Sequence, residues 1–533
     1  ALYPLSHAQE RIWFLHQLEP DNAVFNIPYV VSVKGELSIE CLSNAIDCLV
    51  QRHESLRMQF VVQADRPYQA VLDAQQHCLQ QKTIEEPERL DCIEQESARP
   101  LRIDDGEVFR AVLWQSPEQN TLQLSLHHII CDGWSLGLLT HELMTVYQQF
   151  VIGAQVDVKV PSLQYHDYVM WQREWLTEAV LEVQLDYWVQ KLSGCPALLT
   201  IPTDYPRPAI QRFVGDHYVF NVEPELASQL TAFANTQGVT LYMLTMAIWQ
   251  SLLCRYSGQT DICVGSPVVG RPLTALESMV GMFVNAGVIR GDFALNPTFT
   301  ALLKQIKQTV LEAFAHQDLP AEKVIEAVVD SRSLQYAPIA QFALAFQQVP
   351  ALQPQTSDLE FESIGFNQGT SKYDMTLAFV ASDGYLQGEI EYNTDLFNRD
   401  TVEQVARDFV QLAQMVIQDD LPLNSYMFRS ISDLKHELSL DDSIETIVPL
   451  TTIQRDLYID SLLKADTRHQ CLGGHIDIHQ SLNIDVWQSA SQQLVVDYAP
   501  YRSQLIVGGL HSIEPAYLCV HANLAVKWEV IEW

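Results

Sequence analysis

The chain of 533 residues is longer than a single hydrophobic core normally supports, so its length predicts more than one lobe or domain. Its 66 acidic and 32 basic side chains give a formal charge of −34, which would repel phosphate backbones and argues against a nucleic-acid partner. The ten cysteines form no C-x-x-C pair, which is typical of free thiols in a reducing cytoplasm rather than of zinc or redox motifs. We recognise no signal peptide and expect a cytoplasmic protein.

The first 192 residues mix helical and strand patterns. Residues 6–18 carry apolar side chains at helical spacing, and Ser38 begins a second amphipathic helix with a capping-box pattern that lacks only the acid. Further strands are expected in residues 25–35, 68–72, 108–114 and 121–128, and a further helix in residues 134–150.

A proline-rich stretch, residues 193–213, resists regular structure and marks a lobe boundary. After it, strands and helices alternate again as far as a helix in residues 400–418. Residues 239–254 form the most apolar helical pattern, but this segment is short for a bilayer span, so we expect a buried helix and no membrane partner. We therefore predict an α/β fold with two lobes, residues 1–192 and 193–425.

The tail contains an internal repeat of the beginning of the chain. The segment VPLTTIQRDLYIDSLL from Val448 resembles YPLSHAQERIWFLHQL from Tyr3, and Arg502 follows Arg57 at the same offset of 445 residues (502 − 57). We therefore expect a linker in residues 426–445. Residues 446–533 would be the opening of a second copy, which would form a partial third lobe.

Two adjacent histidines stand where a strand gives way to a helix, in TLQLSLHHIICDGWS. Strand alternation puts His128 on the leucine-rich face of the strand and His127 on the other face. At such a junction a backbone N–H can point at a developing anion, and Asp132 could orient a ring or pair with a distant arginine.

Taken alone, this pattern favours a hydrogen-bonded cluster in a core over a catalytic site. A zinc site would need a third ligand, and although His141 is close in sequence, no acid or thiol completes a familiar spacing. We therefore expect no metal. A serine triad is excluded because no G-x-S-x-G elbow accompanies the histidines.

The doubled pattern HHIICDGWS, from His127, resembles the HHxxxDG signature of the condensation domains of nonribosomal peptide synthetases. Six further segments resemble motifs of that family in the family's order. They are SHAQERIWFL from Ser6, RHESLRMQF from Arg52, YHDYVMWQ from Tyr165, VGMFVNAGVIR from Val280, HQDLPAEKVI from His316 and SRSLQYAPIAQ from Ser331. The resemblance covers about residues 1–425, and seven ordered motifs make it specific.

The resemblance implies two lobes similar to chloramphenicol acetyltransferase, joined as a V-shaped pseudo-dimer with a tunnel between them. Donor and acceptor carrier proteins would approach opposite faces, each with a thioester on a phosphopantetheine arm, and adjacent synthetase domains would be further partners. The enzyme would be an acyltransferase in which the acceptor's α-amine attacks the donor acyl group and forms a peptide bond. No cofactor bound by this chain itself is implied.

Matching positions carry the family's roles onto this sequence. The resemblance implies that His128 is catalytic and that the N–H of Gly133 faces the reacting carbonyl. His127 would hold the loop, and Asp132 would form a structural salt bridge with Arg290. The implied tunnel-lining residues are Ser371, in SKYDMTLAF, and Trp134.

The exact role of the histidine and the reaction stay open at this point. His128 could deprotonate the amine, or it could position the amine and stabilise a zwitterionic intermediate. Similar lobes serve acyltransferases that use free coenzyme A, epimerisation-type domains and catalytically silent domains that dock carriers. Residues 35–60 and 202–220 most resemble the subgroup with an L-configured donor. Departures from residues common in the family are Cys131, Ala286, Gly287 and Ala321, all expected near the site.

Overall fold

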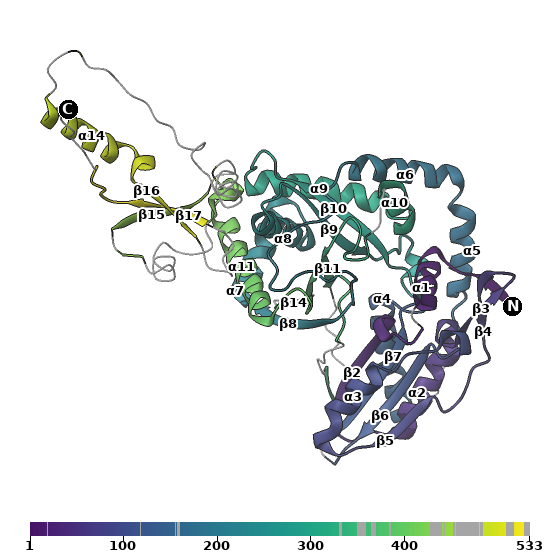
Figure 1. Ribbon diagram of the computed structural model, residues 1–533. Helices are drawn as coiled ribbons and strands as arrows, with labels where there is room; N and C mark the ends of the chain where they lie inside the picture. The colour runs from purple at the N-terminus through teal and green to yellow at the C-terminus, as the bar shows by residue number, and fades with distance from the viewer. Residues whose placement is uncertain are drawn as a thin grey trace. The chain divides into compact units, whose positions relative to one another are not determined.

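The computed structural model describes most of the chain, which divides into two compact units (Figure 1). The first unit comprises Ala1–Cys254 and Gln259–Asp420, and the second comprises Arg255–Gly258 and Leu421–Trp533. The described residues are 1–18, 20–117, 119–154, 156, 160–329, 333–348, 359–363, 369–382, 385–426, 440–441, 443–450, 454, 479, 483–507 and 516–526. Most of the linker expected in residues 426–445 lies outside them, as do Ser331 and Arg332 of one motif.

The amino-terminal lobe is built on a five-stranded sheet in the order β12-β2-β7-β6-β5. Its strands are β2 (Asn26–Lys34), β5 (Leu79–Thr83), β6 (Phe109–Gln115), β7 (Asn120–His127) and β12 (Glu360–Ser363). Its principal helices are α2 (Ile39–Arg52), α3 (Arg89–Ser97) and α4 (Gly133–Val151). Leu122, Leu124 and Leu126 of β7 join the core that contains α2 and α4, whereas Val112 and Trp114 of β6 pack with α3. Both faces of the sheet are therefore buried.

The sequence explains where α2 begins and which side it buries. The side chain of Ser38 accepts a hydrogen bond from the N–H of Cys41, which caps the helix as its pattern predicts. Leu42, Ile46 and Leu49 recur at helical spacing and are buried.

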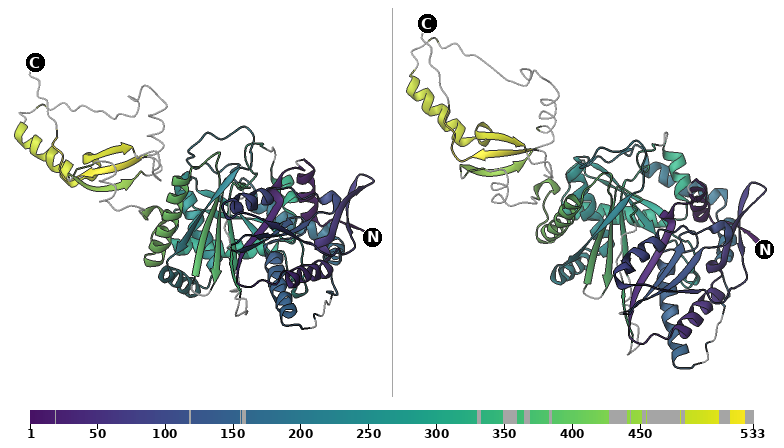
Figure 2. Two further views of the ribbon diagram at one scale, coloured as in Figure 1. Left: turned by 90° about the horizontal axis from the view of Figure 1, so that it is seen from below. Right: turned by 60° about the horizontal axis from the view of Figure 1, so that its bottom comes forward.

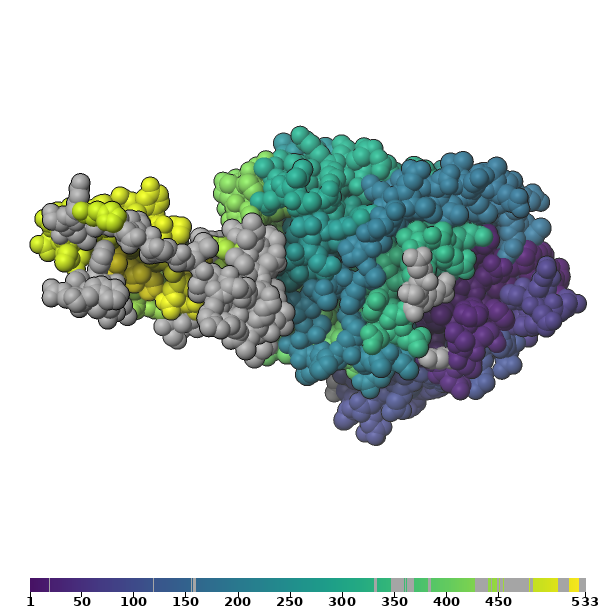
Figure 3. Space-filling model, turned by 45° about the horizontal axis from the view of Figure 1, so that its top comes forward, coloured from purple at the N-terminus to yellow at the C-terminus, as the bar shows by residue number. Residues whose placement is uncertain are grey.

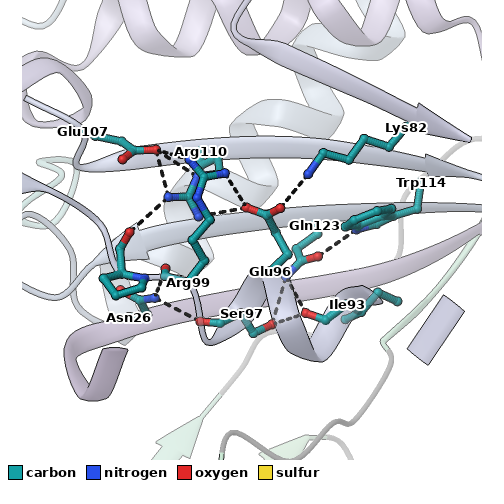
Figure 4. A network of polar contacts seen from close by, with 11 residues as sticks. Asn26, Lys82, Ile93, Glu96, Ser97, Arg99, Glu107, Arg110, Trp114 and Gln123 are labelled. Carbon is teal, nitrogen blue, oxygen red and sulfur yellow. Dashed lines mark hydrogen bonds and ion pairs between the residues drawn. The ribbon is translucent and has the colours of Figure 1, made fainter. Parts of the chain in front are cut away.

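The polar side chains of β7 are satisfied inside the lobe rather than by solvent (Figure 4). Gln123 is fully buried, accepts a 2.7 Å hydrogen bond from the indole N–H of Trp114 and donates to the backbone carbonyl of Ile93 at 3.1 Å. It also donates to the Ser97 hydroxyl at 2.8 Å. The strand therefore alternates in polarity although both of its faces are covered.

A buried ion pair joins α3 to the sheet (Figure 4). Arg110 of β6 donates to Glu96 at 2.9 Å, and their side chains are 2% and 5% exposed. Lys82 donates to the other carboxylate oxygen at 2.6 Å. Burial alone would raise the pKa of Glu96, but Lys82, Arg110 and Arg99 hold it below its ordinary value of 4.5.

The carboxy-terminal lobe is built on a six-stranded sheet in the order β10-β9-β11-β13-β14-β8. Its strands are β8 (Gly215–Val222), β9 (Asp261–Val268), β10 (Asn285–Asp292), β11 (Phe342–Gln348), β13 (Met375–Ser382) and β14 (Tyr385–Asn393). Its principal helices are α7 (Pro224–Gln237), α8 (Leu241–Ser257), α9 (Phe299–Ala315) and α11 (Arg399–Gln418). Figures 1 and 2 show α7 and α11 side by side against the sheet.

Because side chains alternate along each strand, this sheet has one face covered by helices and one face without a helical layer. Leu344, Leu377 and Ile390 are paired across three adjacent strands and are fully buried. Aromatic contacts to α8 and α11 come from side chains on this same face. Side chains at the positions between these residues therefore point to the opposite face of the sheet, toward the amino-terminal lobe.

Two predictions about the second lobe are confirmed. Residues 193–213 contain neither helix nor strand, as their proline content predicts. The apolar segment is α8, in which Met243–Leu253 are all buried. Among the described helices, none is both long enough and apolar enough to cross a membrane.

The two lobes share parts of their cores and form one compact unit. β12 belongs to the carboxy-terminal half of the chain but pairs with β2, with Phe361 opposite Val33. Val280 and Phe283 likewise belong to the core of the amino-terminal lobe. The other elements of this unit are β1 (Leu2–Pro4), α1 (His7–Leu18), β3 (Met58–Gln63), β4 (Arg66–Val71), α5 (Tyr165–Trp175), α6 (Glu178–Leu192) and α10 (Ala321–Val328).

The second unit repeats the local fold of the start of the chain. Its sheet, β15-β17-β16, has the same order as β1-β4-β3. Pro4 lies opposite Tyr68 in the first sheet, and Pro449 lies opposite Tyr517 in the second. The elements are β15 (Ile444–Pro449), α14 (Ile484–Asp497), β16 (Ser503–Val507) and β17 (Ala516–His521), and α14 follows α2 at an offset of 445 at both ends (484 − 39, 497 − 52).

The helix of the repeat differs from α2 in its exposure. Leu42 and Leu49 of α2 are 3% and 5% exposed, but Trp487 and Leu494 at the corresponding positions of α14 are 42% and 44% exposed. The described residues of the second unit include no counterpart of α4, which packs on α2 in the first. The repeat therefore shares the local fold but not the covering layer.

Replacing Glu96 with Gln should lower the free energy of unfolding by about 3 kcal/mol, because Arg110 and Lys82 lose the buried carboxylate that they share and Arg110 keeps only the partly exposed Glu107. The depressed pKa of Glu96 means that its charge stabilises the fold above pH 4.5 and that this contribution is lost as the pH falls through the folded-state pKa. The variant should therefore lose less stability than the parent between neutral and acid pH.

Urea unfolding at pH 7 and pH 4 measures both effects. Glu94→Gln is the matched control, because this carboxylate lies on the same helix but is exposed. Equal midpoints for the two variants at pH 7 would contradict the prediction.

Candidate active site

A cavity of about 280 Å³ lies between the two lobes, and His128 lines it. The carboxy-terminal lobe contributes Ala343, Thr376 and Glu391, which point away from the helix-covered face of its sheet. The start of the chain lies against the segment that contains α10, where Arg11 and Glu322 form a 3.1 Å ion pair (Figure 3). Both halves of the chain therefore build the wall of the cavity.

His128 is held at the end of β7 by its backbone. The strand ends at His127 and α4 begins at Gly133, so His128 opens the turn between them. Its N–H donates to the carbonyl of Phe25 at 2.7 Å, which fixes the backbone next to the cavity. The prediction of a strand-to-helix junction at the histidines is thus confirmed.

The environment of His128 keeps its imidazole neutral. Burial, together with the nearby charge of Lys372, lowers the pKa of His128 to about 3, against a smaller opposing effect of backbone groups. Its Nδ1 atom has no hydrogen-bond partner among the described residues. A neutral ring in this position can accept a proton or a hydrogen bond from a substrate.

The contacts of His127 are typical of a structural residue. It is 2% exposed, and its Nδ1 accepts a 3.1 Å hydrogen bond from the N–H of Ile129. Burial, with the neighbouring His16, holds the pKa of His127 well below its ordinary value. The ring therefore supports the turn that carries His128.

Asp132 connects the turn to the other lobe. It is fully buried and caps α4 by accepting a 2.8 Å hydrogen bond from the N–H of Ser135. Its other oxygen accepts from the N–H of Phe283, in the loop before β10, at 3.1 Å. Gly133 follows as the first helical residue, so its N–H belongs to the helix start, where backbone donors lack intrahelical acceptors.

The arginine partner of Asp132 is Arg271, so the predicted pairing with Arg290 is wrong. Arg271 lies 3.3 Å from Asp132, donates to the Ser135 hydroxyl at 2.7 Å and is 2% exposed. Arg290 instead forms a two-point ion pair with Asp261 of the adjacent strand, at 2.8 and 2.6 Å. Sequence matching selected an arginine on β10 whose side chain faces β9 and not the turn.

Two glycines allow the second lobe to approach this closely. Gly270 has φ +66°, and a Cβ atom there would stand 2.1 Å from the carbonyl oxygen of Phe283. A Cβ atom on Gly281 would stand 1.9 Å from the Tyr165 ring. The loop that carries Arg271 therefore needs glycine at both positions.

The residues predicted to line the tunnel do not line this cavity. Ser371 is fully buried and donates to the carbonyl of Tyr373 at 2.7 Å. Trp134 is 49% exposed and donates to the carbonyl of Glu277 at 2.8 Å. The lining positions are instead Lys372 and Tyr373. The sequence pointed to Ser371, one residue before Lys372. It did not identify Lys372 because the pattern does not show which side chains at the start of this strand face the cavity.

The departures from the family pattern have different surroundings. Ala286 lines the cavity, whereas Gly287 and Ala321 are not among its lining residues. Cys131 is fully buried, and burial raises the pKa of its thiol well above the ordinary value. Within the described part of the chain, no three His, Cys, Asp or Glu side chains gather into a group that could hold a metal ion.

Comparison with known proteins assigns the family. The family model called Condensation domain matches residues 1–428. The chain is 37% identical over 457 residues to a linear gramicidin synthase of Brevibacillus parabrevis, a match that covers 84% of this chain and 6% of the synthase polypeptide. The chain therefore belongs to the condensation-domain family, whose matched members are parts of nonribosomal peptide synthetases and form peptide bonds as acyltransferase-type enzymes.

Solved structures have the same fold. The four-domain nonribosomal peptide synthetase AB3403 aligns with a TM-score of 0.72 at 22% identity, over 81% of this chain and 34% of that one. The first condensation domain of the calcium-dependent antibiotic synthetase aligns with a TM-score of 0.68 at 19% identity, over 81% of this chain and 99% of that one. The predicted α/β fold of two lobes is thereby confirmed.

Replacing Arg271 with Met should lower the free energy of unfolding by about 3–5 kcal/mol, because the buried carboxylate of Asp132 loses its cation. The matched change Arg290→Met removes a partly exposed pair and should cost about 1 kcal/mol. Thermal and urea unfolding of both variants measure the difference. Equal losses, or a larger loss for Arg290→Met, would contradict the assignment.

Proposed function

We propose that the chain joins a donor acyl or peptidyl thioester to the α-amine of an acceptor aminoacyl thioester, each held on a carrier protein by a phosphopantetheine arm. The observation that carries this proposal is the neutral His128 in a cavity built by both lobes. The chain spans 6% and 8% of the lengths of two gramicidin synthase polypeptides that it matches. Upstream and downstream carriers and adjacent synthetase domains are therefore its proposed partners.

In the proposed reaction the amine nitrogen attacks the thioester carbonyl, a C–N bond forms, and the C–S bond breaks. An α-amine has a pKa near 8, and a thiol of pKa about 8.5 is a good leaving group, so the step does not require a strong base. His128 accepts or orients the proton that the amine loses, and the leaving sulfur takes a proton to become a thiol.

The surrounding residues have supporting roles in this proposal. The N–H of Gly133, at the start of α4, would face the developing oxyanion. His127 and Asp132 would hold the turn, with Arg271 as the cation that fixes Asp132. The phosphopantetheine belongs to the carriers, and an L-configured donor is the proposed stereochemical subtype.

We further propose that residues 446–533 begin a second condensation-type lobe. The equal strand order and equal pairing register of the two small sheets support this. Arg57 and Arg502 also donate to equivalent carbonyls at the end of the middle strand, those of Leu72 and His521.

Replacing His128 with Ala should lower dipeptide formation about 100-fold or more, the effect expected for a positioned acid–base or orienting group. The assay loads two carrier proteins with aminoacyl groups and measures the dipeptidyl thioester by mass spectrometry. His141→Ala is the matched control, because this histidine is exposed on α4. It should keep the parental rate.

The other outcomes separate the alternatives. An unchanged yield with His128→Ala would reject the histidine's role. Equal rates with free acyl-coenzyme A would favour a coenzyme A-dependent acyltransferase. Inversion of a carrier-bound residue without dipeptide would favour epimerisation, and carrier binding without either product would favour a docking scaffold.

A further inference from the structure

Aromatic side chains of α5 form part of the wall of the cavity that contains His128. Tyr168, Trp171 and Trp175 recur at helical spacing on this helix, and all three line the cavity. The rings of Trp171 and Trp175 are stacked, with their centres 5.5 Å apart and an angle of 12° between their planes. The helix therefore presents a continuous aromatic surface to the space that His128 also lines.

The core of the amino-terminal lobe holds these rings in place. The centre of the Tyr168 ring lies 6.0 Å from that of Trp171 and 4.6 Å from that of Phe283. Gln172 donates a 3.0 Å hydrogen bond to the Tyr168 hydroxyl. Phe283 is the residue whose N–H donates to the buried carboxylate of Asp132. The aromatic wall is therefore fixed before any ligand arrives, which lowers the entropic cost of binding.

The two tryptophans stay exposed although the rings behind them are buried. Trp171 and Trp175 are 37% and 38% exposed, whereas Tyr168 and Phe283 are 9% and 3% exposed. A contiguous exposed apolar surface on the wall of a cavity is typical of a ligand-binding site. The tryptophan pair therefore fits an apolar part of a ligand.

Charged groups also reach the cavity, from α1 and from the segment at the start of α10. Arg11 and Glu322 neutralise each other in a 3.1 Å ion pair. Asp318 accepts a 3.4 Å hydrogen bond from the side-chain amide of Gln184. A carboxylate also attracts cations, so a cationic side chain is the competing class of ligand.

We propose that Trp171 and Trp175 form a subsite that selects thioester substrates with an aromatic or large apolar side chain. Such a side chain stacks on the indole rings and removes apolar surface from water, which favours it over glycine and over a charged side chain. The inference deepens the proposed function and rests on it for the thioester form of the substrates.

Calorimetric titration of the full chain tests the subsite without turnover. The probes are phenylalanyl, glycyl and lysyl analogues of an aminoacyl pantetheine in which an amide replaces the thioester. The parent chain should bind the phenylalanyl analogue about tenfold or more tightly than the other two, the discrimination that a hydrophobic pocket supplies. The phenylalanyl analogue should also give the most negative heat-capacity change, because it buries the most apolar surface.

Substitutions on α5 connect this preference to the tryptophans. Trp171→Ala or Trp175→Ala should remove most of the preference, and Phe at either position should retain part of it. Met170→Ala is the matched control, because this side chain is 43% exposed on the same helix and is not among the lining residues. It should keep the parental ratio of affinities. Thermal unfolding identifies any variant that fails to fold, and the other tryptophan variants then decide.

Dipeptide formation provides the second readout. Phenylalanine, glycine and lysine are loaded in turn on the donor and on the acceptor carrier, and the preference should appear at one of the two positions. The ratio of kcat/KM for phenylalanine over glycine should fall about tenfold in Trp171→Ala. A general structural defect would instead lower both rates equally and leave the ratio unchanged.

The inference and the proposed function fail separately. The inference is overturned if the phenylalanyl analogue does not bind more tightly than the glycyl and lysyl analogues. It is also overturned if the parental ratio survives both alanine substitutions, even when dipeptide forms. If the parent chain forms no dipeptide with any loaded pair, the proposed function fails, while calorimetry still decides whether the tryptophans select an apolar side chain.

Discussion

The buried carboxylate of Asp132 is the contact on which the geometry of the site depends. It caps α4, accepts a hydrogen bond from the N–H of Phe283 and forms an ion pair with Arg271. A fully buried carboxylate is tolerated only when several donors surround it, so these contacts must form together. Because two of the donors come from the second lobe, the geometry of the turn that carries His128 depends on the packing of the two lobes. The backbone that carries the His128 ring is therefore held by an interaction in which the ring itself takes no part.

The cavity follows from a difference between the two sheets. The amino-terminal sheet is covered on both faces, and even its polar alternation is satisfied internally through Gln123. The carboxy-terminal sheet has helices on one face, and its other face presents small or polar side chains such as Ala343 and Thr376 to the neighbouring lobe. Small side chains on that face leave room that bulky ones would fill. The cavity therefore lies on the face of the carboxy-terminal sheet that has no layer of helices.

Sequence predicted the elements better than the contacts between them. Helices α2, α8 and α11, the strand before the histidines and the irregular stretch after α6 all follow from local patterns. β12 could not be predicted because its partner β2 is more than 300 residues away in sequence. The expected pairing of Asp132 with Arg290 was wrong because motif order carries no information about which way a side chain on a strand or loop points. Lys372 and Tyr373 were missed as lining residues for the same reason, because the sequence does not show which side chains next to β13 face the cavity.

Comparing the repeat at the end of the chain with the first copy distinguishes features that form from local sequence from features that need tertiary packing. α14 has its cap, with Asn483 accepting from the N–H of Val486, and the small sheet keeps the register of the first copy. Yet Trp487 and Leu494 stay exposed where Leu42 and Leu49 are buried. Capping and strand pairing are satisfied within short segments, whereas burial of a helix face requires a second layer to pack against it. The turn that contains His127 and His128 in the first copy depends on tertiary packing in the same way. Its geometry is held by the loop of the carboxy-terminal lobe that carries Arg271 and Phe283. A repeat with the same local signals but without that loop would form the elements and still lack the site.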